Sequence, residues 1–154
     1  MQERLDFAKA APDAYKAVYE LERYIREESG LDPRLLHLIR LRASQINGCA
    51  YCVDMHVKES RRDGLSEQWI NMMSVWQESP IYDDRERAVL GWTEALTNVA
   101  QTRAPDADYE RLREFFDDAE MTKITVVIGA INVWNRLCVG FRRMHPVDAP
   151  AEVS

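Results

Sequence analysis

The apolar residues of this 154-residue chain recur three and four positions apart, and no stretch alternates apolar and polar residues as a half-buried strand does. In the segment 12–29, for example, Tyr15 and Val18 share one side of a helix, and Gly30 follows as a stop signal. Because this spacing is kept along most of the sequence, a β-sheet has no segment from which to form. The sequence therefore predicts an all-α fold of six to eight helices in a single domain, residues 1–154.

Caps and prolines predict where these helices begin. Asp32 followed by Pro33 is a cap followed by a proline at the first helical position, and that helix should end near Ile46. The later helices are expected over 48–63, from Ser66, from Asp83 or Asp84, from Pro105, and over 122–143. The last of these is apolar nearly all round in its first half, so we expect it to be central.

The stretch 35–60 holds most of the residues that could carry chemistry. It contains the C-x-x-C pair Cys49 and Cys52, with His56 four residues after the second cysteine and His37 upstream. Positions three, four and seven apart share a helix face, so Cys49, Cys52 and His56 are expected to form one stripe.

A dithiol at the start of a helix is typical of a redox site. Asn47 and Gly48 suit a helix start, with Asn47 as the predicted cap. The positive helix end would stabilise a thiolate at Cys49, and an imidazolium at His56 would stabilise one at Cys52.

Two other interpretations of these residues stay open. Zinc could take Cys49, Cys52 and His56 as ligands, with His37 as a fourth, although C-x-x-C-x-x-x-H on one helix is cramped for tetrahedral closure. The pair could also be two buried thiols without function. The third cysteine, Cys138, is expected to pack in the last helix as a small apolar residue.

Charge and composition exclude some classes of function. A net charge of −6 argues against nucleic acid and against an anionic membrane surface. Residues 1–10 lack the apolar segment of a signal peptide, and the apolar run Ile124–Trp134 is too short to span a bilayer. Three cysteines, an odd number, fit catalysis or metal binding better than a disulfide framework, so we expect a cytoplasmic protein.

The residues L-R-A-S-Q-I-N-G-C-A-Y-C-V-D-M-H, Leu41 to His56, resemble the signature of the carboxymuconolactone decarboxylase superfamily. Within it they resemble the alkyl hydroperoxidase D-like (AhpD-like) branch. The close match covers about Asp32 to Gly64, and the flanking helices agree in pattern. This resemblance implies an all-α fold, a homo-oligomer that is commonly a trimer or hexamer, and two cysteines that reduce peroxides.

The same resemblance implies a role for each site residue. Cys52 would attack the peroxide, Cys49 would be the resolving thiol, and His56 would be the proton-relay base. The family pattern places a glutamate twelve residues before the first cysteine, where this chain has His37, and some members carry a histidine at the position of Tyr51. If His37 completes the relay, it should lie near His56, and a glutamate in its place should raise the pKa of His56.

The helix-end field favours Cys49 as the nucleophile, whereas the imidazole of His56 favours Cys52 and can also move protons. We therefore predict that Cys52 is the nucleophile, as the imidazole and the family resemblance both indicate. Cys52 would be oxidised to a sulfenic acid, Cys49 would condense with it, and an external dithiol would reduce the disulfide. No flavin, haem or nicotinamide fingerprint is present, so we expect no cofactor. The expected partners are an organic hydroperoxide or hydrogen peroxide and a dithiol reductant protein.

Competing functions are the lactone decarboxylation that names the superfamily, in aromatic catabolism, and a non-enzymatic redox-sensing or zinc-holding role.

Glu59 is expected to belong to the solvated end of its helix. Asn132 and Asn135 are expected to pin neighbouring backbone or to approach the site, because buried amides need partners. Four large side chains at helical spacing predict core, a subunit contact, or an apolar wall for a hydroperoxide: Trp69, Met72, Met73 and Trp76.

Overall fold

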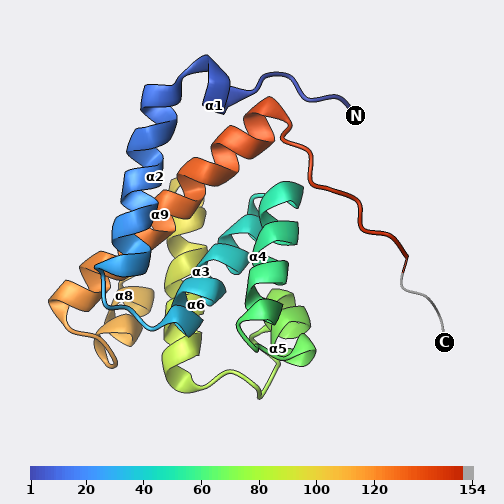
Figure 1. Ribbon diagram of the computed structural model, residues 1–154. Helices are drawn as coiled ribbons and strands as arrows, with labels where there is room; N and C mark the ends of the chain where they lie inside the picture. The colour runs from blue at the N-terminus through green and yellow to red at the C-terminus, as the bar shows by residue number, and fades with distance from the viewer. Residues whose placement is uncertain (151–154) are drawn as a thin grey trace.

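The computed structural model describes residues 1–150, and over that range its regular secondary structure is entirely helical (Figure 1). The all-α class is therefore confirmed. In chain order the helices are α1 (Phe7–Ala10), α2 (Pro12–Glu27), α3 (Pro33–Ile46), α4 (Ala50–Arg62), α5 (Glu67–Asn71), the 3-10 helix η1 (Met72–Val75), α6 (Asp84–Thr97), α7 (Val99–Thr102), α8 (Asp106–Arg113) and α9 (Asp118–Phe141). The nine α-helices within residues 1–150 exceed the predicted six to eight because α1 and α7, of four residues each, are too short to show an apolar period.

The predicted helix starts are mostly confirmed. The side chains of Asp32, Ser66 and Asp83 each accept a backbone N–H in the first turn of the helix that follows, at 2.9, 3.1 and 2.8 Å. The last helix begins at Asp118, four residues earlier than predicted, because Asp117 forms a capping box with its first turn.

Helix α3 is the centre of the fold and packs against α4, α6 and α9 (Figure 1). Helix α9 packs against α2, α3, α4, α6 and α8, which confirms its predicted central position. By length and composition alone α9 could cross a membrane, but a buried helix of a soluble protein passes the same test. The contacts of α9 with these helices account for its apolar character.

The stripe from Trp69 to Trp76 belongs to the core. Trp69 and Met73 are 1% and 0% exposed, and Met72 and Trp76 pack half-buried against the same apolar cluster. The core interpretation is confirmed. Trp69 and Met73 are buried within the chain, so a subunit contact at this stripe could use only Met72 and Trp76.

Candidate active site

The turn between α3 and α4 places the two cysteines. Gly48 has φ 66°, in the left-handed region that favours glycine, and turns the chain out of α3. Cys49 is the N-cap of α4, and its Sγ accepts the backbone N–H of Cys52 at 3.3 Å. The prediction that Asn47 caps this helix is wrong, because Asn47 is the C-cap of α3 and its side chain points to another partner.

That partner is a pair of amides on α9. The Nδ2 of Asn47 donates to the Oδ1 atoms of Asn132 and Asn135, both at 2.9 Å, and Asn135 Nδ2 donates to Ser44 Oγ at 3.0 Å. Asn132 and Asn135 thus bond the turn before the cysteines through its side chains, and Asn132 Nδ2 also donates to the backbone carbonyl of Ile128 at 2.8 Å, as predicted. Since buried amides are costly to leave unpaired, these bonds fix where α4 begins relative to α9.

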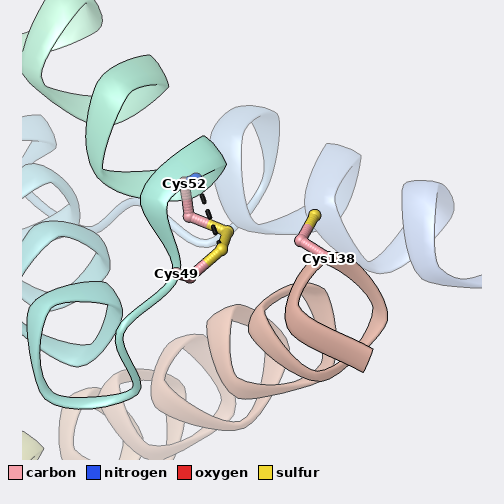
Figure 2. Close-up of side chains that lie close together, drawn as sticks. All are labelled: Cys49, Cys52 and Cys138. Carbon is pink, nitrogen blue, oxygen red and sulfur yellow. Dashed lines mark hydrogen bonds between the residues drawn. A yellow bond between two sulfur atoms is a disulfide. The ribbon is translucent and has the colours of Figure 1, made fainter. Parts of the chain in front are cut away.

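Three cysteine sulfurs gather at the start of α4. Cys49 and Cys52 form a disulfide and are each 1% exposed, and their Cα atoms are 5.3 Å apart. Cys138, in the last turns of α9, is buried too, and the three Sγ atoms lie within 4.8 Å of one another (Figure 2). Cys138 packs in the last helix as predicted, but the sequence contains no signal that it packs against this disulfide.

The environment of Cys138 favours the protonated thiol. Burial raises the pKa of Cys138 to about 11, although the positive charge of Arg143 opposes this shift. The neutral thiol is therefore its resting form at pH 7.

His56 lies on α4 one turn after Cys52 and is 3% exposed. Burial lowers the pKa of His56, against the opposing effect of Glu59, so its ring is neutral at pH 7. Nδ1 lies 3.0 Å from Glu59 Oε2, and Nε2 is buried without a hydrogen-bond partner among residues 1–150. We assign the proton to Nδ1, where it is donated to Glu59, and Nε2 is then a free acceptor.

Glu59 is a site residue that the sequence interpretation missed. Its side chain is 17% exposed rather than solvated, and the hydrogen bond from His56 lowers the pKa of its carboxyl to about 2. Arg26 Nη2 lies 3.7 Å from Glu59 Oε1, and Arg26 Nε lies 3.2 Å from Glu22 Oε1. Glu22 also bonds the buried Arg40. The spacing of three residues between His56 and Glu59 was the available signal.

His37 lies apart from these residues. Its Nε2 is 2.8 Å from Oδ2 of Asp63, the C-cap of α4, whereas His56 lies nearer the start of that helix. The structure therefore brings Cys49, Cys52 and His56 together but does not place His37 with them. Among residues 1–150, the ligand atoms that lie close enough to share a metal are the sulfurs of Cys49, Cys52 and Cys138 rather than the predicted set with His56 and His37, and two of these sulfurs are joined in the disulfide.

Cys52, His56 and Cys138 line a cavity of about 190 Å³, whereas Cys49 does not. Aromatic side chains from α1, α2, α4 and α9 form much of its wall: Phe7, Tyr15, Tyr19, Tyr51 and Trp134. A small organic molecule in this largely apolar space would therefore lie beside Cys52 and His56.

The carboxymuconolactone decarboxylase family model matches residues 12–95. The uncharacterised protein YdfG of Bacillus subtilis is 34% identical over 139 residues, which are 90% of this chain and 94% of that protein. A solved structure from Agrobacterium tumefaciens, of a protein of unknown function considered a candidate antioxidant-defence protein AhpD, is 63% identical with a TM-score of 0.93 and covers 96% of this chain and 100% of its own. An uncharacterised peroxidase-related protein from Silicibacter is 26% identical with a TM-score of 0.75, and the match covers 84% of this chain and 68% of that one.

Proposed function

Because the chain belongs to the carboxymuconolactone decarboxylase family, we propose that it is a thiol-dependent peroxidase of the alkyl hydroperoxidase D type. Its substrate would be hydrogen peroxide or an organic hydroperoxide, and its role antioxidant defence. One observation carries the proposal: Cys52 and the buried His56, whose Nε2 has no hydrogen-bond partner among residues 1–150, line the same cavity. The descriptions of the Agrobacterium and Silicibacter proteins agree with it.

The first step uses Cys52 and His56 in the reduced protein. The Nε2 atom of His56 takes the proton of the Cys52 thiol, and the thiolate attacks one peroxide oxygen. The O–O bond breaks, Cys52 becomes a sulfenic acid, and the leaving alkoxide or hydroxide takes the proton from His56. Cys52 is favoured over Cys49 as the nucleophile because Cys52 lines the cavity and Cys49 does not.

The second step closes the disulfide that the structure contains. The thiol of Cys49 condenses with the Cys52 sulfenic acid, which forms the S–S bond and releases water. The Cα separation of 5.3 Å in the closed pair lies within the range that a disulfide requires. An external dithiol protein then reduces the pair by thiol–disulfide exchange, and no bound cofactor takes part.

The proposal is tested by following peroxide consumption with a panel of dithiol donors that includes lipoyl and thioredoxin-like carriers. We expect turnover with at least one donor, and one equivalent of peroxide should reduce the titratable thiols from three to one. Unchanged thiols and unconsumed peroxide across the panel would contradict the proposal.

Glu59 is proposed to orient His56, in the position of the acid in a nucleophile–base–acid triad. Glu59→Gln should lower the pKa of His56 further, because the carboxylate is what opposes the effect of burial. A weaker, less well-oriented base should also slow oxidation of Cys52 at pH 7 by at least about tenfold. NMR titration of the ring protons and stopped-flow oxidation measure the two effects.

Glu67→Gln is the matched control, because the exposed Glu67 carboxylate pairs with Arg61 and does not contact His56. We expect it to leave both the His56 titration and the oxidation rate unchanged. An unchanged His56 titration in Glu59→Gln would remove Glu59 from the site.

We also propose that the protein acts in the cytoplasm as a homo-oligomer, a trimer or a hexamer as in the family it resembles. Light scattering at micromolar concentration should then give a mass that is three or six times the 17.9 kDa of one chain. A species of 17.9 kDa under those conditions would contradict this expectation.

A further inference from the structure

Two of the three cysteines, Cys52 and Cys138, line the cavity, whereas Cys49 does not. Cys138 therefore lies beside the residue that a peroxide in this cavity would oxidise.

Distance also favours a reaction between these two side chains. The Sγ atoms of Cys49, Cys52 and Cys138 are within 4.8 Å of one another, and the disulfide and the Cys138 sulfur lie across from each other between α4 and α9 (Figure 2). Phe7 and Tyr51 pack around the three sulfurs, so they share one enclosed apolar space. Closing the bond would bring the two Sγ atoms from within 4.8 Å to about 2 Å, and rotation about the Cα–Cβ bonds of Cys52 and Cys138 moves these sulfurs.

We propose that Cys138 is a second resolving thiol, able to condense with the Cys52 sulfenic acid in place of Cys49. This inference rests on the proposed peroxidase function. The reaction forms a Cys52–Cys138 disulfide and releases one water, so two thiols and one peroxide give a disulfide, an alcohol or water, and water. The Cys49 thiol can then exchange with that disulfide, which gives the observed Cys49–Cys52 bond and returns Cys138 to its thiol.

The proton of Cys138 needs an acceptor in this step, because the resting thiol is neutral. His56 is suited to accept it, since His56 lines the same cavity and its Nε2 has no hydrogen-bond partner among residues 1–150. Once the leaving alkoxide has taken the first proton, His56 is again a neutral base. It can then transfer the Cys138 proton to the hydroxide that leaves Cys52 as water.

The two resolving routes have different structural results. The Cys49–Cys52 bond stays within the first turn of α4, whereas a Cys52–Cys138 bond would link α4 to α9. A peptide map under non-reducing conditions distinguishes them, because the second bond joins peptides far apart in the sequence.

The test compares Cys49→Ser with the double variant Cys49→Ser/Cys138→Ser after one equivalent of hydrogen peroxide. Cys49→Ser should lose both of its thiols, take up no sulfenic-acid probe, and yield a Cys52–Cys138 peptide within a single chain. The double variant should hold a sulfenic acid on Cys52 with a lifetime at least about tenfold longer. Cys138→Ser is the matched control and should form the Cys49–Cys52 bond normally.

A stable sulfenic acid on Cys52 of Cys49→Ser, with the Cys138 thiol still free, would overturn the proposal. So would loss of both thiols through bonds between chains, which a non-reducing gel detects. Failure of the peroxidase function gives a different result, because the double variant would then keep its one thiol and form no sulfenic acid. Circular dichroism checks that each variant is folded.

Discussion

Cys52→Ser is expected to abolish peroxide turnover, with a loss of at least about 10³-fold when peroxide consumption is measured with excess dithiol donor. The serine hydroxyl is not ionised by His56 and cannot be oxidised to a sulfenic acid, so the first step has no nucleophile. Cys49→Ser should lose steady-state turnover through the normal disulfide but keep the first oxidation of Cys52 at its original rate. The contrast between the two variants separates the attacking thiol from the resolving one.

The opposite assignment has a distinct result. If a sulfenic-acid probe labels Cys49 in Cys52→Ser, and the first-turnover rate is normal, the two cysteines have the reverse roles. The helix-end field acting on Cys49, the N-cap of α4, would then outweigh the imidazole.

His56→Gln should lower the rate of Cys52 oxidation at pH 7 by about 10²- to 10⁴-fold, the usual contribution of a general base. The pH profile should change as well. Burial holds the pKa of His56 below 6.5, so the base is neutral in the wild-type protein at pH 7 and stays so down to below pH 6.5. The wild-type rate should therefore be level over this range and fall only in more acidic solution. In the variant the rate should rise with pH, because hydroxide in solution must then remove the thiol proton that His56 removes in the wild type.

His37→Gln is the informative comparison, because His37 is a buried histidine on the neighbouring helix that bonds Asp63 instead of the site. We expect its oxidation rate and pH profile to match the wild type. A loss as large as that of His56→Gln, in a folded variant, would show that the relay runs through His37 as the resemblance implies.

The sequence predicted the elements whose determinants are local. Asp32, Ser66 and Asp83 cap helices through their own first turns, and the apolar period depends only on spacing, so these predictions needed no tertiary information. The pairing of His56 with Glu59 was also local, but it was missed because burial decides whether a helix-surface pair is solvated.

The remaining features depend on contacts between distant segments. The neighbourhood of Cys138 and the disulfide exists because α9 packs against α4, and no spacing along the chain predicts that contact. Asn47 was predicted as a cap from its position before the cysteines, yet amides on α9 bind its side chain more favourably. His37 was predicted to lie near His56 because of its position in the family motif, but its side chain lies against Asp63 instead.

The bonds from Asn47 to Asn132 and Asn135 also limit what the cysteine motif can do by itself. The segment Leu41–His56 looks self-contained, and the family match ends at residue 95, before α9 begins. The side-chain hydrogen bonds that anchor the turn before Cys49 nevertheless come from α9. Transplanting the motif into another helical pair would therefore carry the two cysteines and the base without the anchor that sets their register. A transplant that keeps the site geometry would need α3, α4 and α9 together, although α9 lies far from the other two helices in the sequence.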